Sequence, residues 1–384
     1  MKVSVLIIGA GDLGGRVLDL LVRLDGIGKI IIAGRDEEYL HRKKNLSMFA
    51  ALQLGYYPDL AHVKMDIDDI DHTAETILKL KPDIIFNAAT RQALWRVLVP
   101  LPREVSEELG RAQLGPWLPV HLTLVHKLMQ AVKNTGLDCR VVNAAFPDAV
   151  HPVLAKWELA PTIGVGHVGD IIPALRKSIS LFLKEPVEKV EVLFVAQHYI
   201  THFIPRFGYP VDAPCYLKAM VDGSDVTGRL DLHRVYGALT KQLAQTGTEA
   251  QIITATSATR IIEAMANNTR ELVHAPGPNG LPGGYPVKVD AKGGAVWLPE
   301  TLSFEEAIRI NEEGQRADGI DRIDMDGTVH FVDKPMGVMK RILGYQCKTM
   351  KVEESEGYAR ELVAKSRELV ARYSGSSGLS GSLP

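Results

Sequence analysis

Three glycines near the N-terminus have the spacing that a phosphate-binding turn needs. Gly9, Gly11 and Gly14 follow the continuous apolar run 3–8, which predicts a buried strand, and they open a segment with apolar residues at helical spacing. Gly9 permits a tight turn, Gly11 lets a pyrophosphate approach the backbone, and Gly14 lets the helix pack close to the strand. N–H groups at the helix N-terminus then face the phosphates. The alternative is a purely structural turn, but this context predicts a dinucleotide site that includes Asp12 and Leu13.

The residues after the second expected strand, 29–33, bear on which dinucleotide is bound. An acidic side chain there would bind the ribose hydroxyls, whereas an arginine would pair with a 2′-phosphate. Arg35 stands at this place and Asp36 follows it. We expect NADP, with NAD as the alternative in which Arg35 is solvated and Asp36 binds the ribose. Asp66 is a candidate contact on the adenine side, or equally a solvated strand end.

The elements that would position this site alternate along the first half of the chain. Strands alternating with helices predict a parallel sheet with right-handed crossovers. The segment 91–117, which contains three prolines and two tryptophans, interrupts the alternation and is expected to be a long loop with at most short helices. The expected strands are 3–8, 29–33, 63–68, 83–87 and 140–143, and helices are expected after the glycine turn, near 73–80 and over 118–136.

The second half of the chain is more mixed. Residues 187–203 alternate as a strand does, and further strands are expected at 285–289 and 295–298. Helices are expected at 255–268, 304–315 and 354–373. We expect a dinucleotide-binding domain at 1–150, a catalytic, substrate and oligomerisation domain at 151–373, and a flexible Gly/Ser-rich tail at 374–384.

The bulk properties are those of an ordinary globular protein. A chain of 384 residues with 46% hydrophobic residues fits two domains with proper cores. The formal net charge of -2 gives no field that favours nucleic acid. Three scattered cysteines argue against a disulfide framework, and neither a membrane span nor a signal peptide is expected. We therefore expect a cytoplasmic protein that acts on a small molecule, without nucleic-acid or membrane partners.

From Asn87 onward the chain resembles the lactate/malate dehydrogenase superfamily. Residues 141–150, Val-Val-Asn-Ala-Ala-Phe-Pro-Asp-Ala-Val, resemble the family's strand that ends in Ser-Asn-Pro-x-Asp. Residues 164–170, Gly-Val-Gly-His-Val-Gly-Asp, resemble its Gly-Ser-Gly-x-x-Leu-Asp motif, and 194–198, Phe-Val-Ala-Gln-His, its Leu-Gly-Glu-His segment. The resemblance spans residues 1–320 and implies an α/β fold, in which a Rossmann domain with a parallel sheet precedes an α+β catalytic domain. It also implies a homodimer or homotetramer.

The first 90 residues also resemble saccharopine-dehydrogenase-type reductases. The similarity lies in the Gly-Arg-Asp turn at 34–36 and in the segment Lys-Pro-Asp-Ile-Ile-Phe-Asn-Ala-Ala at 81–89. The two resemblances imply further cofactor contacts at the ends of the fourth and fifth strands, by Asn87, Ala88, Ala89 and Asn143.

The resemblance to lactate/malate dehydrogenases implies a catalytic pair of His198 and Asp170. His198 would exchange a proton with the substrate oxygen while the nicotinamide exchanges the hydride. Asp170 would accept the other ring N–H, fix the tautomer and favour the imidazolium. On the residues alone, His198 is an ordinary histidine on a strand and Asp170 caps a helix.

Arginines that could bind the substrate differ from the family's pattern. The family's carboxylate-binding arginine corresponds to Pro173, and Arg176 lies one helical turn further on the same face. Arg91 and Arg96, early in the long loop, are candidates to polarise the substrate carbonyl, and solvent-facing side chains are the alternative. The missing arginine puts a simple 2-hydroxy acid in doubt and favours a different polar anchor, or a larger and less charged ketone or alcohol.

A metal site is not expected from the histidines. His198 and His202 would need helical spacing to share a face, whereas their segment is expected to be a strand, and no cysteine stands near them. The sequence therefore predicts an NAD(P)-dependent oxidoreductase acting on a carbonyl or hydroxyl group. The alternatives are an opine- or saccharopine-type C–N dehydrogenase and a non-catalytic NADP-binding sensor.

Overall fold

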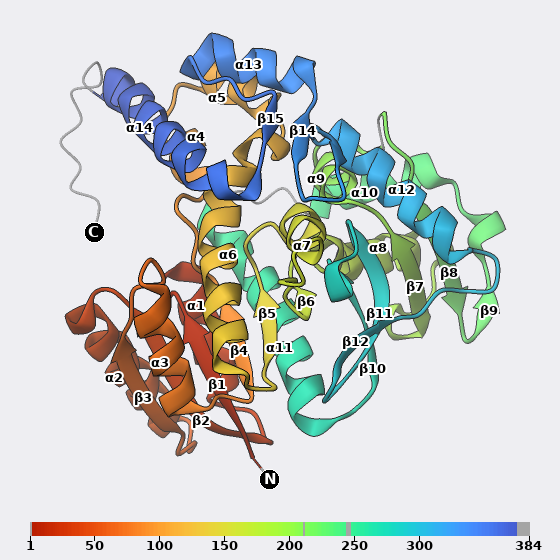
Figure 1. The fold of residues 1–384 in the computed structure, drawn as a ribbon. Coiled ribbons are helices and arrows are strands. Elements are labelled where there is room, and N and C mark those ends of the chain that lie inside the picture. The colour runs from red at the N-terminus through yellow and green to blue at the C-terminus, as the bar shows by residue number, and fades with distance from the viewer. Residues whose placement is uncertain (1, 210–211, 243–246, 375–384) are drawn as a thin grey trace.

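The first part of the protein is a six-stranded parallel sheet with helices on both faces. The computed structural model describes residues 2–209, 212–242 and 247–374. The strand order is β3-β2-β1-β4-β5-β6 (Figure 1). The elements are β1 (Val3–Ile8), α1 (Asp12–Leu21), β2 (Ile27–Gly34), α2 (Glu37–Gln53), β3 (Asp59–Lys64), α3 (Ile70–Leu80), β4 (Ile84–Asn87), α6 (Leu118–Thr135), β5 (Arg140–Asn143), α7 (Pro147–Ala155) and β6 (Ile163–Gly164). The chain order reverses between β1 and β4, where the carboxyl ends of such a sheet form a ligand crevice. The predicted α/β fold is confirmed.

The central strand β1 is apolar on both faces because helices cover both sides of the sheet. Val5, Leu6 and Ile7 are fully buried, and β1 pairs in parallel with β2 on one side and with β4 on the other. The strands predicted at 3–8, 29–33, 83–87 and 140–143 are thereby confirmed, with small differences at their ends.

The prediction of the third strand was wrong by about four residues. It was expected at 63–68, whereas β3 spans Asp59–Lys64 at the edge of the sheet. Met65 and Ile67 follow the strand and are almost fully buried in the core. Their alternation therefore comes from a connection that packs inward, in which the backbone N–H of Met65 still donates to Gly34 at the end of β2.

The segment 91–117 is more ordered than the long loop that was predicted. It contains the helices α4 (Trp95–Leu98) and α5 (Arg103–Gly110) and the short 3-10 helix η1 (Gly115–Trp117). Trp117 is 1% exposed, and Leu109 and Leu114 are buried in the same core. The segment is thus fixed to the body of the protein by apolar packing.

The middle of the chain adds two antiparallel sheets with helices packed around them. One sheet has the order β7-β8-β9 and the other β10-β11-β12. The strands are β7 (Val190–Val195), β8 (Tyr216–Val221), β9 (Ser224–Asp225), β10 (Glu271–Pro276), β11 (Gly284–Asp290) and β12 (Gly293–Val296). The helices are α8 (Val168–Leu183), α9 (His198–Phe207), α10 (Leu232–Gln242), α11 (Gln251–Asn267) and α12 (Phe304–Ala317), with the 3-10 turns η2 (Val187–Lys189), η3 (Thr227–Arg229), η4 (Gly247–Ala250) and η5 (Pro278–Gly280).

The prediction of strand over 187–203 was wrong in its second half. β7 ends at Val195, and the helix α9 begins at His198. The side chain of Gln197 accepts a hydrogen bond from the backbone N–H of Tyr199, which caps this helix. Ile200 and Ile204, four residues apart, are fully buried on one helical face. The predicted strand was therefore too long, because it continued beyond the capping residue Gln197.

The last part of the chain folds back over the segment 91–117. It consists of β13 (Ile320–Ile323), β14 (Val329–Phe331), α13 (Asp333–Leu343), β15 (Thr349–Met350), η6 (Val352–Glu354) and α14 (Ser355–Ser374). Figure 1 shows α13 beside α5, and α14 beside α4 and α6. The tail predicted at 374–384 lies, beyond Ser374, outside the described residues. None of the helices in the described ranges combines the length and apolarity needed to cross a bilayer.

Arg91 fastens the C-terminal helix to the first domain. Its guanidinium pairs with Asp68 and with Glu356 at the start of α14, where Nη2 lies 2.7 Å from Oε2. Lys127 of α6 also reaches Asp68, with Nζ 2.5 Å from Oδ1. The hydrogen bond from Arg91 lowers the pKa of Asp68 to about 2. Arg91 therefore ties the start of α14 to the connection between β3 and α3.

Replacing Arg91 by alanine should destabilise the fold. The Arg91 side chain is 18% exposed, so its loss leaves two half-buried carboxylates poorly compensated. We expect the free energy of unfolding to fall by about 1–3 kcal/mol in urea denaturation. The control is Arg103→Ala, because Arg103 is 89% exposed and its loss should leave the stability nearly unchanged. Equal effects of the two substitutions would contradict this assignment.

Candidate functional site

The glycine turn between β1 and α1 has the shape of a phosphate cradle. Gly9 has φ +89°, and a Cβ at Gly14 would lie 2.0 Å from the carbonyl oxygen of Gly9. A Cβ at Gly9 would meet the backbone nitrogen of Ala89 at 3.0 Å. A Cβ at Gly11, in contrast, would meet nothing within 4 Å. Gly9 and Gly14 are thus required by close packing, while Gly11 faces open space before the N-terminus of α1, as a dinucleotide requires.

Among the predicted cofactor contacts in this turn, Asp12 and Leu13 lie in the first turn of α1. Asp12 pairs with Arg16 one turn later, with Nε 3.3 Å from Oδ1. Ala88 and Ala89 follow β4 and lie against Gly9, so the carboxyl ends of β1 and β4 meet here.

Arg35 projects from the end of β2 and is exposed. No ion pair joins it to another side chain in the described ranges, whereas the nearby Arg42 pairs with Glu38 and Lys43 with Asp19. Asp36 is occupied as the N-cap of α2, where it accepts a hydrogen bond from the backbone of Tyr39 at 2.9 Å. Arg35 is therefore left available to a ligand at this strand end.

Asp66, the other predicted contact on this side, is exposed after β3. Its Oδ1 accepts a hydrogen bond from the backbone N–H of Asp68 at 3.1 Å.

Asn87 and Asn143 form a polar chain behind the crevice. The amide of Asn87 donates to Oδ1 of Asn143 at 2.9 Å, across the paired ends of β4 and β5. Asn143 in turn lies 3.0 Å from Nε2 of His151, and Nδ1 of His151 lies 2.7 Å from the carbonyl oxygen of Gly277. Burial lowers the pKa of His151 to about 4, so its neutral ring accepts from Asn143 and donates to Gly277. These two asparagines hold the strand ends in place.

His198 forms a hydrogen-bonded pair with a buried carboxylate that the sequence reasoning missed. Its Nδ1 lies 3.0 Å from Oδ2 of Asp318, whose side chain has no exposed surface. Asp318 also accepts hydrogen bonds from Gln197 at 3.1 Å and from the backbone N–H of Leu114 at 3.2 Å. An ionised carboxylate only accepts, so Nδ1 of His198 carries the proton and Nε2 is left for other contacts.

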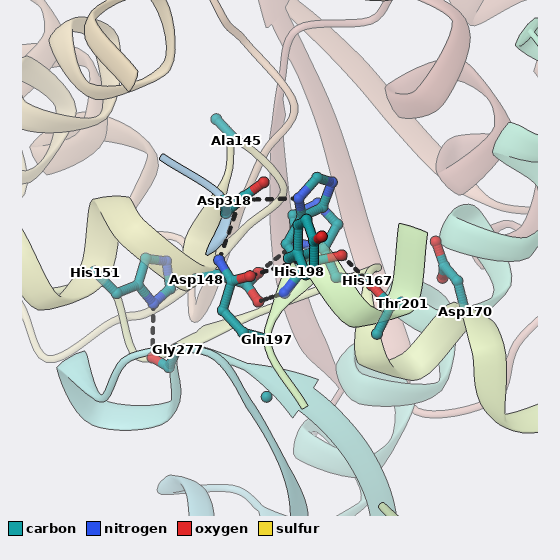
Figure 2. A network of polar contacts seen from close by, with 12 residues as sticks. Ala145, Asp148, His151, His167, Asp170, Gln197, His198, Thr201, Gly277 and Asp318 are labelled. Carbon is teal, nitrogen blue, oxygen red and sulfur yellow. Dashed lines mark hydrogen bonds and ion pairs between the residues drawn. The ribbon is translucent and has the colours of Figure 1, made fainter. Parts of the chain in front are cut away.

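His167 forms a second pair of the same kind, with Asp148 (Figure 2). Oδ1 of Asp148 also accepts the backbone N–H of His198 at 2.9 Å. Burial opposes the charges, yet each partner stabilises the other, so the pKa of His167 is raised and that of Asp148 is lowered. The two imidazole rings face each other, with their centroids 4.5 Å apart.

Aromatic side chains enclose the two histidines. The ring of Phe146 meets His198 and His167 edge-on, at centroid distances of 5.7 and 6.2 Å. His202 stacks on His198 at 5.4 Å, one turn further along α9. Burial is the main reason why the pKa of His202 lies well below its usual range. Apart from the carboxylates that hold them, the two rings are therefore packed against aromatic side chains.

The predicted pairing of Asp170 with His198 does not form. Oδ2 of Asp170 accepts a hydrogen bond from Thr254 of α11 at 2.6 Å, and Oδ1 is buried without a hydrogen-bond partner among the described residues. Burial raises the pKa of Asp170 to about 6. Figure 2 shows Asp170 on the far side of His167 from Asp318, because the first turn of α8 directs this side chain toward α11.

Two of the three arginines predicted as substrate contacts, Arg176 and Arg91, are engaged elsewhere. Arg176 donates to the carbonyl oxygens of Val190 and Val187, at 2.7 and 3.1 Å, and so ties α8 to the start of β7. Arg91 is held by Asp68 and Glu356. The structure therefore brings neither arginine to His198.

The reason given from the sequence for discounting a metal does not hold, because His198 and His202 do share a helical face. Within the described ranges, no group of three or more His, Cys, Asp or Glu side chains has an arrangement that could hold a metal ion.

Of the four residues that form the two pairs, the sequence reasoning assigned a role only to His198. Asp148 stands in the segment Phe146-Pro147-Asp148 that carried the family resemblance, and His167 lies inside the glycine motif at 164–170, so both had a local signal. Asp318 had no such signal in the sequence, because it follows the end of α12 and is 120 residues from His198.

Comparisons with known proteins agree with this fold. Residues 5–95 match the family model described as the saccharopine dehydrogenase NADP binding domain. A malate dehydrogenase from Plasmodium falciparum, in complex with NADH, aligns with a TM-score of 0.54 at 15% identity, over 94% of this chain and 100% of that chain. The chain has the fold of the malate and lactate dehydrogenases.

Two further structures support that statement. A lactate dehydrogenase from Cryptosporidium parvum, complexed with lactic acid and nicotinamide adenine dinucleotide, aligns with a TM-score of 0.57 at 15% identity, over 83% of this chain and 96% of that chain. A malate dehydrogenase from the same organism aligns with a TM-score of 0.56 at 15% identity, over 83% of this chain and 99% of that chain. A search of curated proteins gives no match. The two resemblances seen in the sequence are confirmed, one for the dinucleotide-binding domain and the other for the fold.

The raised pKa of Asp170 predicts how a substitution there changes stability with pH. A carboxyl whose pKa rises from 3.8 to about 6 on folding stabilises the fold below pH 3.8, and this contribution is lost as pH rises through 6. Asp170→Asn keeps an acceptor for Thr254 and removes the buried charge. We expect the variant to be more stable than the parent at pH 8 by about 1–3 kcal/mol, with the difference vanishing near pH 4, in thermal unfolding series. A variant that is less stable at pH 8 would contradict the raised pKa.

Proposed function

We propose that this protein transfers a hydride reversibly between a nicotinamide dinucleotide and a carbonyl or hydroxyl substrate, with His198 as the acid and base. The observation that carries the proposal is the hydrogen bond between Nδ1 of His198 and the buried Asp318. It leaves Nε2 available to a substrate. The comparisons support a nicotinamide dinucleotide as cofactor and a dehydrogenase fold as the scaffold.

The chemistry of His198 follows from its partner. Nε2 of the neutral ring takes the proton of a substrate hydroxyl, and in the reverse direction the imidazolium returns a proton to the carbonyl oxygen. Asp318 stabilises the imidazolium and fixes the ring tautomer, while Gln197 and the backbone of Leu114 hold Asp318 in place. The nicotinamide, when bound, supplies or accepts the hydride. Phe146 packs edge-on against His198 and helps to exclude water from it.

We propose NADP as the preferred dinucleotide, with NAD as the alternative. Arg35 is exposed and has no ionic partner among the described side chains, so its guanidinium can pair with a 2′-phosphate. Asp36, which would bind the ribose hydroxyls of NAD, is already used as a helix cap. The cradle at Gly9, Gly11 and Gly14 suits either dinucleotide.

A cytoplasmic homodimer or homotetramer is part of the same proposal. The three cysteines are free thiols, and burial raises the pKa of each. Buried thiols of this kind suit a reducing compartment.

A second candidate is a C–N dehydrogenase of the opine or saccharopine type. The match of residues 5–95 to the saccharopine dehydrogenase NADP binding domain favours it. That match covers the cofactor domain alone, so an assay must decide. Oxidation of NADPH that requires both an amine and an oxo acid would favour this candidate over the carbonyl reductase.

Substitution of His198 tests the proposed acid/base role. His198→Asn should lower kcat by roughly 10²- to 10⁴-fold, and Asp318→Asn should lower it at least about 10-fold, since the tautomer is no longer fixed. Turnover is followed by dihydronicotinamide absorbance with ketones, oxo acids and alcohols. The control is His330→Asn. His330 lies on the remote strand β14 and is likewise paired with an aspartate, Asp324. Unchanged turnover in His198→Asn would show the assignment to be wrong.

Substitution of Arg35 tests the choice of dinucleotide. Arg35→Ala should raise the Kd of NADPH about 10- to 100-fold, as expected for a charged hydrogen-bonded contact, and should leave the Kd of NADH nearly unchanged. Both constants are measured by fluorescence titration, with Arg42→Ala as the control because Arg42 pairs with Glu38. An equal weakening of both dinucleotides would refute the 2′-phosphate contact.

A further inference from the structure

The pair of His167 and Asp148 has no part in the proposed hydride transfer, although it faces His198 directly. The imidazole centroids are 4.5 Å apart and the ring planes are inclined by 59°. Both rings are held through Nδ1 by carboxylates that have no exposed surface. Nε2 of His167 pairs with no group in the described ranges, and 21% of the side chain is exposed.

The position of His167 is set by its backbone as well as by Asp148. His167 has φ 50° and ψ −105°, at the N-cap of α8, a conformation that side-chain-bearing residues rarely adopt. Such strain persists where the surroundings enforce it, and it is often found at ligand sites. Asp148 enforces it here, since the same carboxylate binds the ring of His167 and the backbone N–H of His198.

The charge of the site favours a neutral ligand. Three carboxylates act on His167, those of Asp148, Asp170 and Asp318. No lysine or arginine is among the principal charges acting on it, and the nearest basic residue on α9, Arg206, acts on His202 two turns from the start of the helix. A carboxylate ligand would enter a site whose fixed charges are already mostly negative, whereas a hydroxyl group would add no charge.

The spacing of the two rings sets the spacing of the groups that they bind. Rings 4.5 Å apart can direct their two Nε2 atoms at oxygens on neighbouring carbon atoms. Nε2 of His198 binds the oxygen on the carbon atom that is oxidised or reduced. Asp148 favours the imidazolium form of His167, so Nε2–H of His167 is a donor to a second oxygen beside it.

We propose that His167 and Asp148 form the binding site for a second substrate oxygen, and that the substrate is a neutral vicinal diol or its 2-hydroxy ketone. This inference rests on the proposed function and names its substrate class. The reaction remains the reversible exchange of one hydride and one proton. His167 acts as a specificity-determining donor beside the acid/base His198.

Three ketones of equal carbon number test the proposal: acetone, hydroxyacetone and pyruvate, each with NADPH. They share the methyl ketone, and the carbon on the other side of the carbonyl is a methyl group, a hydroxymethyl group or a carboxylate. We expect kcat/KM for hydroxyacetone to exceed that for acetone and for pyruvate by about 10- to 100-fold, as one hydrogen bond to a charged donor provides. A preference for pyruvate, or equal values for acetone and hydroxyacetone, overturns the proposal.

The matched variant is His167→Asn, because asparagine tolerates a positive φ better than most residues. It should raise KM for hydroxyacetone about 10-fold or more, whereas the rise in KM for acetone, which has no second oxygen, should be several-fold smaller. Binding of hydroxyacetone is also followed by saturation-transfer NMR with NADP bound, which needs no turnover. If hydroxyacetone binds to the parent protein but not to His167→Asn, and no ketone is reduced, the proposed function is refuted and this inference is supported. If acetone is reduced, and hydroxyacetone binds equally well to the parent protein and to His167→Asn, the proposed function is supported and this inference is refuted.

Discussion

The buried carboxylate of Asp148 is the interaction on which the arrangement of the site depends. It accepts the ring proton of His167 and the first backbone N–H of α9, which belongs to His198. Three helices, α7, α8 and α9, therefore meet at one side chain without exposed surface. A buried charge without partners is unstable, so the three helices are held in the one arrangement that satisfies it.

Asp318 plays the corresponding role between distant parts of the chain. Besides His198 and Gln197, it binds the backbone of Leu114, and its own carbonyl oxygen accepts the N–H of Gly115 at 2.8 Å. A Cβ at Gly115 would come within 2.5 Å of that oxygen. The segment 91–117 and the end of α12 are thus in direct backbone contact, which fixes the position of the carboxylate that binds His198.

The parts of the fold that the sequence could predict are those with local causes. The glycine turn and the strands around it follow from spacing and apolar runs over a few residues, so Gly9, Gly11 and Gly14 could be assigned a role directly. The end of β7 was missed because only the capping side chain of Gln197 marks the change from strand to helix. The partner of His198 could not be found by order along the chain, since the orientation of α8 turns Asp170 toward Thr254. Arg91 was placed correctly after β4, but its partners, Asp68 and Glu356, are set by tertiary packing.

The position of Asp318 in the chain also has a consequence for how the protein is made. The parallel sheet is complete once β6 has been synthesised, whereas Asp318 follows after a further stretch that a ribosome needs about 10–30 s to add. During this interval the dinucleotide-binding sheet can already fold, but His198 has no carboxylate on Nδ1. Under the proposed function, a nascent chain would therefore hold its dinucleotide site before its acid/base pair was complete.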